Sequence, residues 1–153
     1  MNNQIYDIME NQNMPAYQLT FKGYWREINK GGIPAKSGIY IVYRCTYNTI
    51  TKTVDLKDII YIGQAEDGND RVGKHEKLPD FKRELKEGEE LCYSFAEVDK
   101  KDLDIVENAL IFMQKPVVND YLKDSYNHEN ASFKIKGDMT CLKMTDFSIT
   151  TKK

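Results

Sequence analysis

The chain has 153 residues, which is enough for one domain with its own hydrophobic core. Its formal net charge of -2 argues against a uniformly basic nucleic-acid-binding surface, although a local basic patch is compatible with it. Three cysteines without metal-ligand spacing and a polar N-terminus without a signal-peptide pattern predict free thiols and a cytoplasmic location. No apolar run is long enough to span a membrane, so we expect no membrane partner.

The N-terminal part combines a polar start with an aromatic segment. Residues 1–16 are polar and are expected to be loosely structured, whereas residues 17–29 are rich in large apolar side chains. These side chains predict packing at the edge of a core, and stacking against bases is the alternative. The same region begins the most basic stretch of the chain, and its candidate contacts to a nucleic-acid backbone are Lys22, Arg26, Lys30 and Lys36.

Residues 37–44 and 58–63 alternate in the way that strands buried on one face do. Paired as a hairpin, they place one set of side chains against a core, namely Ile39, Ile41, Ile60 and Ile62. Tyr40 and Tyr61 then emerge together on the opposite face. Residues 46–57 predict a ribbon that prolongs the hairpin beyond the sheet. Two glycines bracket the pair and allow a bulge or a close backbone approach, Gly38 and Gly63.

A charged segment follows the hairpin, and we expect a helix over residues 70–86. Arg71 and His75 are one helical turn apart and therefore share a face. Taken alone, Arg71 would be explained by a surface ion pair with Glu76 or Asp67. A packed or solvated side chain would likewise explain His75. Their joint placement favours a functional site.

A third strand is expected over residues 91–98, and residues 101–115 carry the clearest helical pattern. Glu107 lies where the apolar face of this helix begins, so it either reaches outward to water or binds a ligand. Asn119 follows shortly after the predicted end of the helix. Further on, two short segments predict a small terminal hairpin of unknown function, residues 133–136 and 141–147.

Gly38-Ile39-Tyr40 and Tyr61-Ile62-Gly63 resemble the paired motif of the GIY-YIG nuclease superfamily. The resemblance runs from about Pro34 to Asn119 and includes matching polar positions at Arg71, His75, Glu107 and Asn119. It implies an α/β fold of the α+β type, in which a small central antiparallel sheet of three or more strands is flanked by helices. The connection over residues 46–57 departs from the pattern, because many members have a shorter one. The expected organisation is an N-terminal extension packed on the core, a nuclease core and a C-terminal extension, at residues 1–33, 34–119 and 120–153.

The resemblance implies an endonuclease that depends on Mg²⁺ or Mn²⁺ and hydrolyses DNA phosphodiester bonds. Glu107 is expected to bind the metal, which keeps most of its waters, and Arg71 to hold the scissile phosphate. Tyr40 is the candidate general base, with its pKa lowered by nearby positive charge, and Tyr61 orients the water or the phosphate. Spacing alone leaves these two roles interchangeable. His75 is expected to assist by hydrogen bonding or proton transfer.

Asn119 is expected to fix the end of the helix and Glu107, with the two glycines as further supporting residues. A non-catalytic module that keeps this fold and binds nucleic acid or protein is the main alternative, but the intact set of Tyr40, Arg71 and Glu107 argues against it. A metal-independent hydrolase of small phosphate esters would need a phosphate-cradling glycine loop, which is missing. The sequence leaves open whether the protein is a monomer or a homodimer.

Overall fold

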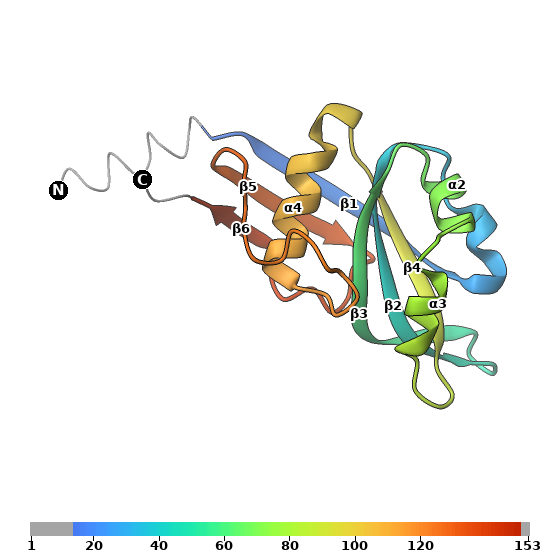
Figure 1. Ribbon diagram of the computed structural model, residues 1–153. Helices are drawn as coiled ribbons and strands as arrows, with labels where there is room; N and C mark the ends of the chain where they lie inside the picture. Colours follow the sequence, from blue (N-terminus) through green and yellow to red (C-terminus); the bar gives the residue numbers. More distant parts are fainter. Residues whose placement is uncertain (1–13, 151–153) are drawn as a thin grey trace.

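A six-stranded sheet organises the computed structural model, which describes residues 14–150 (Figure 1). The order of the strands is β3-β2-β4-β1-β5-β6. Their bounds are β1 (Ala16–Arg26), β2 (Gly38–Asn48), β3 (Thr53–Ala65), β4 (Glu90–Glu97), β5 (Ala131–Gly137) and β6 (Asp146–Ile149). The helices are α2 (Gly68–Gly73), α3 (Leu78–Arg83) and α4 (Leu103–Gln114), with short 3-10 turns η1 (Glu27–Gly32) and η2 (Lys100–Asp102). The mixed α/β class is therefore as predicted, and the sheet is larger than the three strands that the sequence identified.

β1 is the main difference from the expected architecture. Residues 17–29 were expected to pack at a core edge, but residues 16–26 form a strand inside the sheet. β1 is antiparallel to β4 and parallel to β5, so the sheet is not purely antiparallel. Leu19 and Phe21 are buried in this strand, whereas the residues that alternate with them are exposed, namely Gln18, Thr20 and Lys22. The loosely structured start predicted for residues 1–16 lies almost entirely outside the described residues.

The predicted hairpin of β2 and β3 is present and continues as a ribbon beyond the sheet. Tyr40 pairs with Gly63 and Val42 with Tyr61, which places both tyrosines on one face. A bulge follows, because the next pair joins residues 43 and 59 and leaves Ile60 without an opposite residue. Ile60 therefore packs with Tyr61, and the expectation that Ile60 shares a side with Ile62 was wrong.

The sheet separates two hydrophobic cores. The α4 core packs α4 against one face and includes Leu19, Phe21, Ile41, Val106 and Leu110. The α2–α3 core lies on the other face and includes Tyr40, Tyr61, Val72, Phe81 and Tyr93. Figure 1 shows α4 and the two short helices on different sides of the sheet.

The helix predicted over residues 70–86 is two short helices. Asp67 caps the first of them by accepting a hydrogen bond from the backbone N–H of Asp70 at 3.0 Å. This helix ends at Gly73, and Pro79 lies in the first turn of the next. Proline is tolerated in a first turn but breaks a helix interior, which explains why one continuous helix does not form. By contrast, α4 lies within the predicted 101–115 range.

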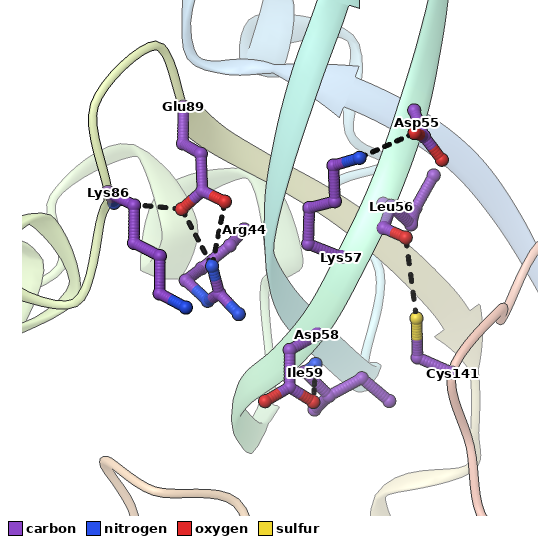
Figure 2. A network of polar contacts seen from close by, with 9 residues as sticks. All are labelled: Arg44, Asp55, Leu56, Lys57, Asp58, Ile59, Lys86, Glu89 and Cys141. Carbon is purple, nitrogen blue, oxygen red and sulfur yellow. Dashed lines mark hydrogen bonds and ion pairs between the residues drawn. The ribbon is translucent and has the colours of Figure 1, made fainter.

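A polar network fixes the ribbon and the chain that leads into β4 (Figure 2). Arg44 Nη1 donates to both carboxylate oxygens of Glu89, at 2.8 and 2.7 Å. The backbone N–H of Lys86 donates to the same carboxylate at 2.8 Å. On the other side of β3, the Cys141 thiol lies 3.8 Å from the Leu56 carbonyl oxygen. The charge of Arg44 is therefore already paired.

A terminal hairpin is present and is formed by β5 and β6, which pair antiparallel with Phe133 opposite Phe147, but its second strand is residues 146–149 and not the predicted 141–147. These strands extend the main sheet through β1, so the C-terminal region is part of the same sheet as the hairpin of tyrosines. All three cysteines are free. In the described part of the chain, no helix is both long enough and apolar enough to cross a membrane.

Candidate active site

Tyr40 and Tyr61 form the centre of the site. Both rings are buried, and their centroids are 6.1 Å apart with nearly parallel planes. The Tyr40 side chain lies across Gly63, where a Cβ would overlap the phenol ring and its hydroxyl. A Cβ on Gly38 would overlap the Ala96 carbonyl oxygen and the Phe95 ring. Both predicted glycines are therefore required by close contacts.

His75 completes the ring cluster. Its ring centroid is 5.5 Å from each tyrosine ring, and its Nε2 is 2.6 Å from the Tyr40 hydroxyl oxygen. Its Nδ1 accepts a hydrogen bond from the backbone N–H of Lys77 at 3.1 Å. Burial, followed by the charge of Arg71, lowers the pKa of His75 to about 4, so the imidazole is neutral at pH 7. Because Nδ1 is an acceptor, the proton of the neutral ring is on Nε2, which donates to Tyr40.

Arg71 reaches the same cluster from α2. Its guanidinium forms a bidentate ion pair with Glu76, with Nη2 2.9 Å from Oε1. This is the surface ion pair that the sequence offered as an alternative, and Arg71 lowers the pKa of the Glu76 carboxyl to about 2. Arg71 is also close enough to both tyrosines to interact with them electrostatically. After the hydrogen bond to Glu76, the negative charge of either phenolate would raise the pKa of the guanidinium. His75 lies just beyond the end of α2, so the two residues converge without sharing one helix.

Burial raises the pKa of Tyr40 well above its ordinary value. The neighbouring Tyr61 phenol raises it further, and Arg71 opposes both effects only in part. The sequence had led us to expect a lowered value. The correction has a simple cause, since a buried phenolate loses its hydration and one partly exposed guanidinium does not replace it.

Two lysines add positive potential around His75. Lys30 and Lys77 act with Arg71 to lower the pKa of the imidazole. Lys30 is paired with Glu27 at 2.9 Å, and Lys77 approaches Asp120 at 3.7 Å. Lys77 was missed by the sequence reading, because a single lysine in a charged segment carries no distinctive spacing.

Glu107 is buried on α4, with 4% of its surface exposed. Its Oε2 accepts hydrogen bonds from the Gln64 backbone N–H at 3.1 Å and the Tyr121 hydroxyl at 3.0 Å. Its Oε1 accepts one from the Gln64 amide at 3.0 Å. Burial raises the pKa of this carboxyl, while these donors act in the opposite direction. No lysine or arginine of residues 14–150 forms an ion pair with it.

Tyr121 joins Glu107 to the tyrosines around the edge of β3. Its hydroxyl oxygen is 3.5 Å from that of Tyr61, while its proton is donated to Glu107. This connection is needed because α4 and the tyrosine rings lie on opposite faces of the sheet. The sequence had predicted one cleft containing Glu107 and both tyrosines, and this arrangement was wrong, because the helix that carries Glu107 packs on the other face of the sheet. The sequence also gave no signal for Tyr121 or Gln64.

Asn119 was expected to fix the end of the helix. In the structure its side chain fixes the outer edge of β3 instead. Its side-chain oxygen accepts from the Ile62 N–H at 3.0 Å, and its amide donates to the Ile62 carbonyl at 2.9 Å. The Val118 N–H donates to the Ile60 carbonyl at 2.9 Å. Asn119 thus holds the strand that carries Tyr61.

The four predicted contacts to a nucleic-acid backbone differ in their availability. Arg26 donates to Glu90 at 2.5 and 3.0 Å and stacks 3.5 Å from the Tyr47 ring centroid. Lys30 is also paired, as described above. Lys22 and Lys36 are exposed, and neither forms an ion pair with any residue of the described chain.

The donor set at this site fits Mg²⁺ better than a transition metal. Among the described residues, no group of three or more histidine, cysteine, aspartate or glutamate side chains could hold a metal ion. Mg²⁺ needs only one or two protein carboxylates, because it keeps several waters and takes phosphate oxygens. Among the described residues Glu107 has no cationic partner, and its Oε1 accepts a hydrogen bond from Gln64 alone, so a lone pair remains for a cation.

No family model matches the chain, and the comparisons with curated proteins and with solved structures found no match either. The function is therefore inferred from the residues of the site itself.

Proposed function

We propose that this protein is a metal-dependent endonuclease of the GIY-YIG type that hydrolyses DNA phosphodiester bonds. The observation that carries the proposal is the grouping of Tyr40, Tyr61, His75 and Arg71 on one face of the sheet. Glu107 is joined to this group through Tyr121. Phenol, imidazole, guanidinium and carboxylate are together the groups that activate water, bind a phosphate and neutralise developing charge.

In this proposal Tyr40 is the general base. The Nε2–H of His75 donates to the Tyr40 oxygen and stabilises the phenolate that must form before the tyrosine accepts a proton from water. Arg71 favours the same phenolate by its charge. The raised pKa of Tyr40 means that the phenol keeps its proton until further positive charge reaches the site.

Arg71 is the phosphate contact. Its side chain is one-third exposed, and its present partner Glu76 is 65% exposed. An exposed ion pair of this kind contributes little to stability, so a phosphodiester can replace the glutamate at small cost. The planar guanidinium then donates two hydrogen bonds to the phosphate oxygens and stabilises the charge that develops on them.

Glu107 would hold Mg²⁺, with Gln64 and Tyr121 orienting its carboxylate. Mg²⁺ held there would supply positive charge to the site and would lower the pKa of nearby acidic groups. Within residues 14–150 no lysine or arginine pairs with this carboxylate, so its charge is available for this task.

The test is cleavage of supercoiled plasmid DNA with Mg²⁺, with EDTA and by Glu107→Gln. We expect cleavage only with the metal, and a loss of about 10³-fold or more in the variant. DNA affinity should hold or rise, because a negative charge has been removed. Asp104→Asn is the matched control, since Asp104 is exposed on the same helix and also accepts from Gln64 at 2.7 Å. Equal cleavage by wild type and Glu107→Gln would refute the proposal.

A non-catalytic binding module is the second candidate. The observations in its favour are the ion pair of Arg71 with Glu76 and the raised pKa of Tyr40. A module of this kind would bind DNA equally well with and without Mg²⁺ and would leave every form of the plasmid intact.

A further inference from the structure

The outer strands of the sheet have one covered face and one open face. In β1, β5 and β6 the covered face contributes to the α4 core. The opposite side of these strands, which we call the open face, carries polar side chains at Gln18, Thr20, Lys22, Ser132, Lys134, Lys136, Asp146 and Ser148. Figure 1 shows α4 over one side of these strands, while α2 and α3 lie beside β2–β4. No helix of the described chain packs on the open face.

The open face carries more positive than negative charge. Lys22, Lys134 and Lys136 are exposed on two neighbouring strands, and none of them forms an ion pair within residues 14–150. Glu97 and Asp146 are carboxylates on this side, and Asp146 is opposite Lys134 in the β5–β6 pair. Lys36 adds a further cation at the rim of the face, in a hollow that Glu97 and Asp99 also line. A local positive excess in a chain of net charge -2 complements a polyanion.

The open face is continuous with the candidate active site. Tyr40 pairs with Phe95 across β2 and β4, and Phe95 pairs with Lys22 across β4 and β1. Opposite residues on paired strands share a face, so Lys22 lies on the tyrosine side, two strand spacings or about 10 Å from Tyr40. A hollow of about 380 Å³ separates β1 from Pro34, and Lys22 lines it.

We propose that the open face is a docking surface for the backbone of duplex DNA, which extends the nucleic-acid contact from the candidate active site to the C-terminal strands. The proposal takes its partner from the proposed function. Lysines with hydroxyl and amide side chains between them suit phosphate oxygens. Trp25 is an aromatic side chain of β1 on this side, but it is partly buried against the α2–α3 core, so it is not an open stacking platform of the kind that binds single strands. We therefore expect binding without sequence preference.

The experiment compares Lys134→Glu/Lys136→Glu with Lys101→Glu/Lys143→Glu. The control changes the net charge by the same amount at two exposed lysines outside the open face. Fluorescence anisotropy of a labelled random-sequence duplex in EDTA gives affinity as a function of salt. Two lost phosphate contacts lower the slope of log K against log[salt] by about 1.8. Since the electrostatic contribution vanishes near 1 M salt, affinity at 0.1 M should fall about 60-fold. The control should change it by less than about threefold.

The outcomes separate this proposal from the nuclease. Equal losses in both double variants, unchanged affinity in the first, or no duplex binding by the wild type would each overturn the docking surface. Loss of binding to phosphatidylserine vesicles with unchanged DNA affinity would assign the face to a membrane and overturn it too. If the lysine variant loses affinity but wild type never cleaves with Mg²⁺, the docking surface stands and the nuclease does not.

Discussion

The two faces of the central sheet have different kinds of core. The α4 core is mainly aliphatic and aromatic hydrocarbon under a helix of 12 residues. The α2–α3 core is smaller, contains the phenols of Tyr40, Tyr61 and Tyr93, and borders the imidazole of His75. Two helices of six residues each cover it. The phenols and the imidazole of the site thus lie in the smaller hydrophobic core, which is covered by the shorter helices.

This difference shows how one small domain separates stability from chemistry. Buried polar groups are costly unless each has a partner, and every buried side-chain nitrogen or oxygen of the described residues has one. In the α2–α3 core, the partners of Tyr40 and Tyr61 are other site residues, His75 and Tyr121, so these hydrogen bonds fix geometry more than they add stability. The α4 core supplies the hydrophobic burial that holds the sheet.

The largest expected effect is on chemistry in the α2–α3 region. Arg71→Ala should lower plasmid cleavage by about 10²–10³-fold, because the developing phosphate charge loses its partner. DNA affinity should fall only slightly, through one lost phosphate contact. Single-turnover rates and anisotropy measure the two effects separately. Glu76→Gln is the matched variant, since it removes the ion pair but keeps Arg71, and it should retain cleavage. Slow cleavage by Glu76→Gln together with fast cleavage by Arg71→Ala would contradict the assignment of Arg71 as the phosphate contact.

The second effect belongs to the α4 core and concerns stability. Leu110 is 1% exposed, and Leu110→Ala should lower the free energy of unfolding by about 3 kcal/mol. Cleavage at a temperature where the variant remains folded should be unchanged. Tyr40→Phe is the counterpart on the other face, which keeps the ring, removes the oxygen and should abolish cleavage. Urea unfolding and single-turnover cleavage of both variants would reveal whether the two cores are as separate as we infer.

The third effect is a pH dependence of stability that comes from His75. Its folded pKa of about 4 is below the ordinary 6.5, so the unfolded chain binds the proton more readily between these values. The stabilisation is complete above pH 6.5 and is lost as the pH falls towards 4, by about 3 kcal/mol in total. His75→Gln lacks this contribution to stability but keeps every carboxylate of the wild type, so the part of the pH dependence that comes from carboxylates is the same in both proteins. Urea unfolding at pH 7 and pH 4 should therefore show a smaller decrease for His75→Gln than for wild type.

The smallest effect concerns the connection between the two faces. Tyr121→Phe removes one donor to the Glu107 carboxylate, which raises the pKa of Glu107 further and costs about 1 kcal/mol. Carbon-13 NMR titration of the Glu107 carboxyl should show the upward shift, and the acid limb of the cleavage profile should move to higher pH. Tyr126→Phe is the control, because the Tyr126 hydroxyl donates to the Glu129 carbonyl oxygen and not to a residue of the site. An unchanged titration would show that Tyr121 does not orient Glu107.

Local pattern was sufficient to predict the hairpin, the common face of Tyr40 and Tyr61, and α4. The bulge at Ile60 could not be predicted from local pattern, because a bulge depends on how β2 pairs with β3 and not on alternation within either strand. The parallel pairing of β1 with β5 was also beyond it, since more than 100 residues separate Leu19 from its partner Ile135. Tyr121 reaches Glu107 through a loop whose course no periodic pattern describes.

The way in which Asn119 contacts β3 also bears on solubility. A strand at the border of a sheet exposes N–H and C=O groups that can recruit another chain. Asn119 presents one donor and one acceptor to Ile62, in the manner of a neighbouring peptide group, so a single side chain substitutes for a seventh strand. Asn119→Ala would reopen that border next to Tyr61. We therefore expect this variant to self-associate through β3, which light scattering would detect before any loss of helical signal.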